Sequence, residues 1–533
     1  MTKYIFITGG VVSSLGKGIT SASIGRLLKS HGFSVNIVKC DPYINVDAGT
    51  MSPYQHGEVF VTDDGAETDL DLGYYERFLG ISCAKANNMT AGQIYQSVIE
   101  KERKGEYLGQ TVQVIPHITD EIKKRFSEAS KGFDITIIEI GGTVGDIESL
   151  PFLEAARQMK INKNSSDIIY IHVTLVPYLT SSDELKTKPT QHSVNKLREI
   201  GIDPDIIVAR SEKKISEEMK KKIALFCSVV PEAVIEAPDA KSIYLVPEIF
   251  KKQGLDEQVM MLLRLRSKKW DFEVWNEFAQ NVKNQESFPE IKLAIAGKYT
   301  KLKDSYKSLN EAIFHAAVAN KIKVKTEYLD TETENPQKAA QYDALIVPGG
   351  FGDRGIEGKI EAIRTARENN IPFLGICLGM QCAAIEFARN AASIKDAHSC
   401  EFKPKCKNPI ISLMEEQKNI SKLGATMRLG SYSCEIKKGT LAETVYGKNK
   451  IEERHRHRYE FNNEYRKIFE SKKMIFSGIN KKLNLVEIME YPNHPFFIAV
   501  QFHPEFKSGP LFPHPLFIGL LKAAMERRNN AGI

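Results

Sequence analysis

The chain has 533 residues, 42% of them hydrophobic and 26% charged, which is typical of a soluble globular protein with about two to four domains. Its 73 Lys and Arg residues against 67 Asp and Glu give a formal net charge of +6, too small for this length to indicate nucleic-acid binding. No apolar run is long enough to span a membrane and the amino terminus lacks signal-peptide features, so we expect a cytoplasmic protein. The eight cysteines show no CxxC spacing, which argues against a disulfide framework or a structural zinc site.

Short apolar runs alternate with helical stretches along the chain, a pattern typical of parallel sheets covered by helices on both faces. Residues 267–289 break this pattern because they are polar and charged and hold both tryptophans, Trp270 and Trp275. We therefore predict an α/β fold with two doubly wound domains, residues 1–266 and 290–533, joined by a linker at 267–289. The predicted strands are Tyr4–Thr8, Val35–Lys39, Ile135–Ile140, Ile168–Leu175 and Ile206–Ala209 in the first domain, and Ile291–Ala296, Ala344–Val347 and Pro372–Ile376 in the second.

The first predicted strand leads into a glycine-rich turn at residues 9–18, which contains Lys17 and precedes a predicted helix at Ile19–His31. Backbone amides and the helix N-terminus of such a turn bind phosphate, and the lysine neutralises its charge. The match to G-x-x-x-x-G-K-[ST] is imperfect, because Val11 replaces the first glycine and Gly18 replaces the Ser/Thr that usually holds magnesium. A metal would then need carboxylates from elsewhere.

Two carboxylates are candidates for that metal. Glu139 lies at the end of an apolar predicted strand, at the edge of the sheet where ligands bind. Asp71 lies in an acidic stretch that is bounded by glycine. A solvated loop or a helix cap is the alternative for each carboxylate, although an unpaired charge at the end of a buried strand is uncommon.

Three polar stretches suggest one site for two anionic ligands. Lys186–His192 combines lysines, hydroxyls and an amide, which suits a triphosphate and a polar base. Asp146–Ser149 offers acceptors for sugar hydroxyls, and residues 49–53 with 55–58 form a third polar loop. Each stretch alone is more often an ordinary surface loop.

A second reactive centre is predicted around Cys377, which lies between Gly375 and Gly379 at a strand-to-helix turn, with a predicted helix at Met380–Arg389. Glycines on both sides of a nucleophile suit such a strained turn. A buried, inert cysteine is the alternative, and the glycines alone do not exclude it.

His503 and Glu505 are the predicted partners of this thiol. Residues two apart in extended chain point to the same side, so Glu505 can orient the imidazole while its other nitrogen faces Cys377. The amides of Gly350 and Leu378 are candidates for stabilising an oxyanion. Together these residues predict a Cys-His-Glu nucleophilic site.

These motifs resemble a known family along nearly the whole chain. Residues 9–18, 39–47, 55–61, 141–148 and 186–192 resemble the synthetase domain of the CTP synthase family. Residues 348–352, 375–381, 454–460 and 501–505 resemble its class I glutamine amidotransferase domain. The resemblance implies a ligase that converts UTP to CTP with ATP and glutamine, by phosphorylating O4 of UTP and adding ammonia at C4.

The resemblance also implies roles for individual residues. Those implied for ATP are Ser14, Leu15, Gly16, Lys17, Gly18, Ile19, Lys39, Asp71, Asp239 and Ala240. Those implied for UTP or CTP are Ser13, Asp146, Ile147, Glu148, Lys186, Thr187, Lys188, Pro189, Thr190, Gln191 and Lys222. Those implied for glutamine are Gly350, Leu378, Gly379, Met380, Gln381, Glu401 and Arg458, beside the catalytic Cys377, His503 and Glu505. Asp71 and Glu139 are the implied Mg²⁺ ligands.

The family further implies activation by GTP, inhibition by CTP, an internal ammonia tunnel and a homotetramer, with filament assembly left open and no nucleic-acid or membrane partner. A different phosphate-loop amidoligase that uses glutamine is the alternative enzyme. A non-enzymatic switch or filament protein with a dead glutaminase domain is the other alternative, but such a protein would be expected to lose Cys377, His503 or Glu505, and all three are present.

Overall fold

The structure is a computed structural model and describes residues 2–49, 51, 57–161, 165–297, 303–350, 352–413 and 427–530. The chain forms two compact units, Met1–Ala48 with Asp71–Ala279 and Gly49–Leu70 with Gln280–Ile533. Among the helices in these ranges, none is both long enough and apolar enough to cross a lipid bilayer. The two-domain α/β class predicted from the sequence is confirmed.

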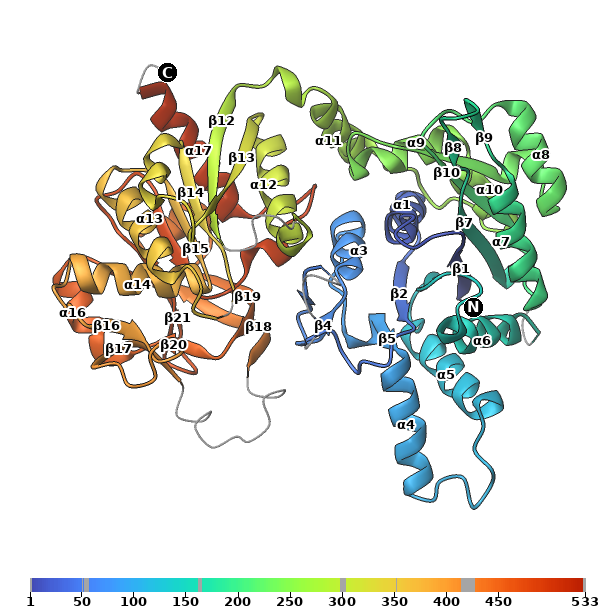
Figure 1. The fold of residues 1–533 in the computed structure, drawn as a ribbon, viewed down its shortest axis with the longest axis horizontal. Helices are drawn as coiled ribbons and strands as arrows, with labels where there is room; N and C mark the ends of the chain where they lie inside the picture. Colours follow the sequence, from blue (N-terminus) through green and yellow to red (C-terminus); the bar gives the residue numbers. More distant parts are fainter. Residues whose placement is uncertain are drawn as a thin grey trace. The chain divides into compact units, whose positions relative to one another are not determined.

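In the described part of the first unit, seven strands form one sheet in which every pairing is parallel (Figure 1). Most of their residues are Ile, Val and other apolar types, as expected for strands that are buried on both faces. In spatial order they are β11 (Val234–Pro238), β10 (Ile206–Ser211), β7 (Ile168–Leu175), β1 (Lys3–Gly9), β6 (Ile135–Ile140), β2 (Val35–Asp41) and β5 (Asn88–Thr90). The five strands predicted here are confirmed to within two residues at each end.

Helices cover both faces of this sheet (Figure 1). On one face α4 (Ala91–Arg103), α5 (Thr119–Ala129) and α6 (Leu150–Ile161) pack on a core that includes Phe6 and Tyr170. The helix α1 packs with α3, α9 and α10, and its Gly25 lies against Ile37 of β2. Their bounds are Lys17–Ser30 for α1, Asp71–Leu79 for α3, Val246–Lys252 for α9 and Leu255–Leu262 for α10.

The described part of the second unit has a nine-stranded sheet that is parallel at one end and antiparallel at the other. The parallel strands are β13 (Lys323–Asp330), β12 (Glu290–Gly297), β14 (Ala344–Val347), β15 (Phe373–Ile376) and β23 (Phe497–Val500). The antiparallel strands that follow are β22 (Leu485–Glu490), β21 (Ile475–Asn480), β18 (Arg428–Ile436) and β19 (Lys450–His457). The sequence predicted β12, β14 and β15 but neither β13 nor the antiparallel extension.

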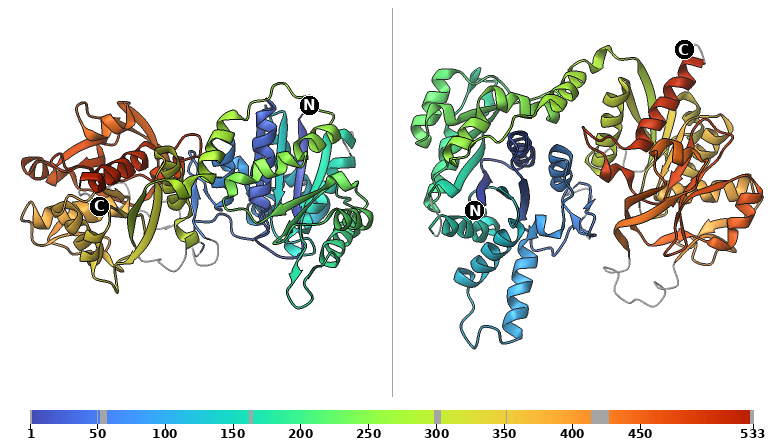
Figure 2. Two further views of the ribbon diagram at one scale, coloured as in Figure 1. Left: turned by 90° about the horizontal axis from the view of Figure 1, so that it is seen from above. Right: turned by 180° about the vertical axis from the view of Figure 1, so that it is seen from behind.

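Four helices sandwich the parallel part of this sheet. One core lies under α13 (Ile356–Glu368) and α14 (Leu378–Asn390), and the other under α12 (Lys307–Asn320) and α17 (Pro515–Asn530). Figure 2 shows α17, in red, on the face that it shares with α12. The helix predicted at Met380–Arg389 is confirmed as α14.

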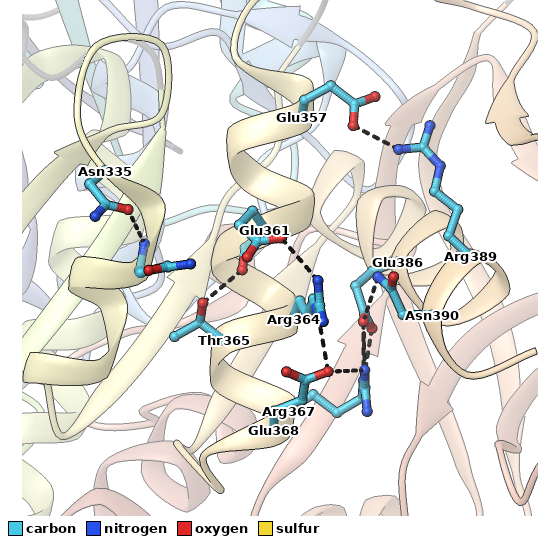
Figure 3. Close-up of polar contacts among 11 residues, drawn as sticks. Asn335, Glu357, Glu361, Arg364, Thr365, Arg367, Glu368, Glu386, Arg389 and Asn390 are labelled. Carbon is cyan, nitrogen blue, oxygen red and sulfur yellow. Dashed lines mark hydrogen bonds and ion pairs between the residues drawn. The ribbon is translucent and has the colours of Figure 1, made fainter. Parts of the chain in front are cut away.

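Ionic contacts join α13 to α14 (Figure 3). The Arg367 guanidinium donates to both carboxylate oxygens of the buried Glu386, at 2.8 Å to Oε1 and 3.0 Å to Oε2. Arg389 Nη1 donates to Glu357 Oε2 at 2.7 Å. A bidentate pair fixes both distance and orientation. These contacts therefore fix the helix that begins directly after Cys377.

The segment predicted as a linker contains α11 (Glu273–Lys283) and a buried aromatic anchor. Trp275 is fully buried, its Nε1 donates to the Tyr244 carbonyl at 3.1 Å, and the Arg26 guanidinium lies 5.3 Å from its ring centroid. Trp270, by contrast, is 47% exposed. Residues as far as Ala279 pack with the first unit. The domain boundaries at 266 and 290 stay a prediction.

Replacing the buried tryptophan should destabilise the first unit. We expect Trp275→Ala to lower its free energy of unfolding by about 3–5 kcal/mol, because the change leaves a large cavity and removes the hydrogen bond to Tyr244. Urea unfolding followed by far-UV circular dichroism measures the effect. Trp270→Ala is the matched control and should cost much less, and equal losses for the two variants would contradict the anchoring role of Trp275.

Candidate active site

The phosphate loop lies between β1 and α1, as predicted. Val11, Ser14 and Gly16 have positive φ values of 80°, 57° and 89°, so the chain makes a tight turn before the helix begins at Lys17. Lys17 Nζ donates to the Gly142 carbonyl at 2.6 Å. Burial and, to a smaller extent, the nearby Lys39 lower the pKa of Lys17. A phosphate at this loop would meet a lysine that is already directed at the carboxyl ends of the strands.

A buried chain of hydrogen bonds lies beneath Gly10 of the phosphate loop and supports it. Thr8 Oγ1 and His172 Nδ1 lie 2.8 Å apart, and His172 Nε2 lies 2.8 Å from Ser193 Oγ. A Cβ at Gly10 would collide with Ser193, so only glycine fits there. Burial lowers the pKa of His172 to about 3, which keeps this imidazole neutral. These residues are distant in sequence, so no local motif predicted this chain.

The two predicted metal ligands lie on either side of one lysine. The buried Glu139 accepts from Lys39 Nζ at 3.0 Å, from the Tyr75 hydroxyl at 2.6 Å and from Ser21 Oγ at 2.9 Å. Lys39 also forms an ion pair with Asp71. Burial acts to raise the pKa of Glu139, but Lys39 and the Tyr75 hydroxyl hold it below its ordinary value. Glu139 is therefore anionic, and both carboxylates pair with the one Lys39 amine.

The carboxylate of Asp71 takes the space that a side chain at residue 18 would need. A Cβ added at Gly18 would lie closer to Asp71 Oδ1 than van der Waals contact allows. Among the described residues, no group of three or more His, Cys, Asp or Glu side chains has the arrangement of a metal site. Asp71 and Glu139, which both pair with Lys39, would form a two-carboxylate set, and such a set fits Mg²⁺ because that ion commonly takes one or two protein carboxylates together with substrate phosphates.

A pocket of about 230 Å³ opens beside the phosphate loop. It brings together Ser14, Leu15, Gly16 and Ile19 with the predicted Asp239 and Ala240. Arg210, which the sequence analysis missed, also lines it and donates to the Ala237 and Pro238 carbonyls and to Asp239 Oδ1, at 2.9, 3.0 and 2.7 Å. Arg210 directly follows the predicted strand Ile206–Ala209, and this position at a strand end could have marked it as a pocket residue. Apolar walls and these polar groups suit a flat base next to phosphates.

The residues implied for the second nucleotide are divided between buried and exposed positions. Thr187, Thr190 and Gln191 are buried at the start of α7 (Lys188–Glu199), where Thr190 Oγ1 donates to the Leu175 carbonyl at 3.0 Å. The exposed members are Ser13, Asp146, Ile147, Glu148, Lys188 and Lys222, and Lys186 and Pro189 are half-buried. Except for the apolar Ile147, these exposed members carry polar side chains at the protein surface, where a ligand can reach them.

The third polar stretch belongs to the second unit. Thr50 and Ser52–His56 lie outside the described residues. Glu58 Oε2 accepts from the Ser308 amide at 2.9 Å, and residues 49–70 pack with the second unit. Arg454 donates to Asp63 and Arg456 to Glu67, each at 2.7 Å. The hypothesis that this loop shares a site with the other two stretches stays a prediction.

Cys377 lies on a strained turn between β15 and α14. Its φ of 52° and ψ of −101° are unusual for a residue with a side chain, and its amide donates to the Val500 carbonyl at 2.7 Å. A Cβ at Gly379 would collide with the Val347 carbonyl, so this flanking glycine is required by close packing. The geometry is that of a nucleophile elbow.

His503 and Glu505 form the predicted pair, with Nδ1 and Oε1 2.7 Å apart. The prediction that an extended backbone brings these two side chains together was wrong. His503 precedes a 3₁₀ turn at Pro504–Lys507, so the segment is not extended. A Cβ at Gly349 would lie 2.7 Å from His503 Cε1, so this glycine makes room for the imidazole.

Charge favours a thiolate at this site. Burial acts to raise the pKa of Cys377, but His503 and His457 lower it to about 6. Burial likewise opposes charge on His503, but Glu505 and Cys377 raise its pKa to about 10. At neutral pH the pair is therefore a thiolate and an imidazolium. His457 was missed by the sequence analysis, which assigned no role to it.

The thiol lies between two cavities of the second unit. One is lined by Gly350, Leu378, Gln381, Glu401, His457, Arg458 and Tyr459. It therefore gathers five of the residues predicted for glutamine, whereas Gly379 and Met380 are packed in α14. The other, of about 290 Å³, is lined by residues that include Glu58, Val59, Tyr306 and His503. A carboxylate and a guanidinium in the first cavity suit an amino acid's ammonium and carboxylate groups.

Comparison with known proteins shows the family of the chain. Residues 3–265 match the family described as CTP synthase N-terminus, and residues 301–523 match glutamine amidotransferase class-I. The CTP synthase of Geobacter sulfurreducens is 56% identical over 99% of both chains. The chain belongs to the CTP synthase family. The CTP synthase of Caldanaerobacter subterraneus, another relative in this family, is 57% identical over the whole of both chains. The glutaminase domain of Trypanosoma brucei CTPS, solved with bound acivicin, is 36% identical and covers 44% of this chain and 94% of that one, with a TM-score of 0.42.

The lowered pKa of the Cys377 thiol predicts that this cysteine is alkylated selectively. At pH 7 Cys377 should react with iodoacetamide before Cys227 and Cys382, because burial raises the pKa of those thiols to about 11 and about 12. The rate at Cys377 should fall as the pH drops through about 6. Peptide mass spectrometry after timed labelling measures both. A rate that still rose steeply between pH 8 and 9 would show an ordinary thiol.

Proposed function

We propose that this chain converts UTP to CTP with ATP and glutamine, as a ligase that forms a carbon–nitrogen bond. The observation that carries the proposal is that one chain of this family holds both a phosphate loop beside Lys39 and Glu139 and a thiolate held between two histidines. Phosphorylation turns O4 of UTP into a leaving group, and ammonia can then attack C4. Glutamine supplies that ammonia because free ammonia is scarce at neutral pH.

In the first unit, Lys17 is the proposed contact for the ATP phosphates, and Lys39 is proposed to assist phosphoryl transfer. Asp239, Ala240 and Arg210 line the pocket proposed for adenine. Asp71 and Glu139 would hold Mg²⁺, which supplies charge neutralisation for the transferring phosphate. The residues proposed for UTP and CTP are Ser13, Asp146–Glu148, Lys186–Gln191 and Lys222.

In the second unit, Cys377 is the proposed nucleophile towards the side-chain amide of glutamine. His503 carries the proton to the departing ammonia and then accepts one from the attacking water, while Glu505 orients it. The amides of Gly350 and Leu378 are the proposed oxyanion donors. Gln381, Glu401 and Arg458 would bind the rest of glutamine.

The cavity lined by Glu58, Val59 and Tyr306 gives ammonia a proposed way out of the glutaminase site. It borders Cys377 and His503, while the presumed glutamine residues line the other cavity. Separate cavities on the two sides of the thiol would let ammonia leave without passing back through the glutamine pocket. The family's internal tunnel is the model for this proposal.

Regulation, assembly and location complete the proposal. GTP is the proposed activator, CTP the feedback inhibitor, a homotetramer the assembly and the cytoplasm the compartment. The domain division proposed is 1–266, 267–289 and 290–533. The alternative, a different phosphate-loop amidoligase, would predict no amination of UTP.

A loss-of-thiol variant tests the division of labour. Cys377→Ala should abolish CTP formation from glutamine but leave formation from ammonium chloride unchanged, because the thiol serves only to release ammonia. The conversion of UTP is followed spectrophotometrically with ATP and Mg²⁺. Cys382→Ala, a buried cysteine of α14, is the control and should keep both activities. Loss of both activities in Cys377→Ala would contradict the proposal.

A phosphate-loop variant tests the other centre. Lys17→Ala should lower CTP formation from either nitrogen source by at least about a hundredfold, because a charge-assisted phosphate contact that strengthens in the transition state is lost. Glutamine hydrolysis measured alone should survive. Lys29→Ala on the same helix, whose amine donates to the Leu79 carbonyl, is the control. Normal ammonia-dependent turnover in Lys17→Ala would rule out the phosphate-loop assignment.

A further inference from the structure

A second histidine–carboxylate pair lies against the thiol. His457, at the end of β19, is 3% exposed and lines the same cavity as Cys377. Its Nε2 lies 2.7 Å from Glu460 Oε1. Within the described parts of the chain, its Nδ1 has no hydrogen-bond partner. The imidazole therefore has one nitrogen committed to a carboxylate, and it interacts with the Cys377 thiol at the cavity.

The carboxylate that holds His457 is itself fixed. Arg428 Nη1 donates to Glu460 Oε1 at 2.8 Å, and Arg428 Nη2 donates to Glu487 Oε1 at 2.7 Å. The three side chains are at most 4% exposed. Arg428 and Glu487 come from β18 and β22 of the nine-stranded sheet, and Glu460 comes from β20 (Tyr459–Phe461) of a separate three-stranded sheet, so the arginine links the two sheets. A buried carboxylate with this support keeps its charge and its place.

This arrangement favours a charged imidazole. Burial acts to lower the pKa of His457, but Glu460 and Cys377 raise it to about 9. Glu460 and Cys377 act on it directly, and His455 and Glu487 are further titratable neighbours. Glu401 and Arg458 line the same cavity. Burial raises the pKa of Glu487 to about 7, so this carboxyl group is partly protonated at neutral pH.

The proposed chemistry leaves a task for a second cation. His503 gives its proton to the nitrogen of glutamine when the C–N bond breaks, so it is neutral while the thioester exists. It then takes a proton from the water that attacks the thioester carbon, and the C–S bond breaks to return glutamate and thiolate. Sulfur must leave as an anion in this last step. A cation that does not take part in the proton transfers would stabilise it throughout.

We propose that His457, held by Glu460, is a positioning residue that keeps its proton through the cycle and stabilises the Cys377 thiolate while His503 transfers protons. The inference rests on the proposed glutaminase function of this site and adds a residue to it. His457 then sets how readily sulfur ionises and leaves, and it does not bind the distant parts of glutamine.

The first test compares His457→Gln with the wild type in the full-length protein. The midpoint of the pH dependence of Cys377 alkylation by iodoacetamide should rise by about one to three units, because a cation close to the thiolate is removed. The kcat for glutamine hydrolysis at pH 7 should fall at least tenfold and recover partly at pH 9, with little change in KM. Glu460→Gln should shift the midpoint in the same direction. An unshifted midpoint in both variants overturns the proposal.

His455→Gln is the matched control. His455 lies two residues earlier on β19, is fully buried and has its ring centroid 5.2 Å from that of His457. Burial, with Arg428, lowers its pKa well below the ordinary value, so it is neutral. Its replacement should cost similar packing but leave the midpoint at Cys377 unchanged, and an equal shift would show that the effect is structural.

A measurement on the wild type does not depend on how the variants fold. The ring carbon shifts of ¹³C-labelled histidine report the protonation of His457, which we expect to stay charged from pH 6 to pH 8. A neutral His457 at pH 7 overturns the inference. If the wild type did not hydrolyse glutamine at all, the proposed function would fail instead, and the spectrum would still report on His457.

Discussion

Charges that are buried away from water must be paired, and both reaction centres of this chain depend on that constraint. An isolated charge in a protein interior costs several kcal/mol or shifts its pKa until it is neutral. In the first unit, Lys39 is held between Asp71 and Glu139. In the second, Arg428 is held between Glu460 and Glu487. Each cluster keeps ionised groups in place where the chemistry needs them.

The same topological rule places both centres. In the first sheet, the phosphate loop, Glu139 and Lys39 come from β1, β6 and β2, which are neighbours in that order. In the second, the Gly349–Gly350 turn, Cys377 and His503 follow β14, β15 and β23, which are also neighbours. The carboxyl ends of parallel strands open at one edge of a sheet, so residues far apart in sequence meet there. The proposed phosphoryl transfer and the proposed glutamine hydrolysis thus both use the carboxyl ends of neighbouring parallel strands.

Much of the fold and of the two candidate sites could be predicted, because the sequence patterns that mark them are local. The apolar runs predicted most of the parallel strands but not β5, β11 or β13, and the turns at Lys17 and Cys377 follow from glycine spacing next to those runs. Arg210, His457 and the His172–Ser193 chain were missed because their meaning depends on which strands become neighbours. The antiparallel strands were missed because charged or polar residues interrupt their apolar pattern, such as Arg428 in β18, Arg454 in β19 and Glu487 in β22. The contact between His503 and Glu505 was predicted for the wrong reason, since a 3₁₀ turn brings them together.

The glycine at position 18 has a consequence for how this phosphate loop can evolve. Its missing side chain leaves room for the Asp71 carboxylate, which comes from a different helix. A Gly18→Ser change would therefore not restore the common loop motif, because the new side chain and the existing carboxylate compete for one volume. The proposed role of Asp71 as a metal ligand could pass to residue 18 only if both positions changed together. This epistasis makes the departure from the common motif hard to reverse by single mutations.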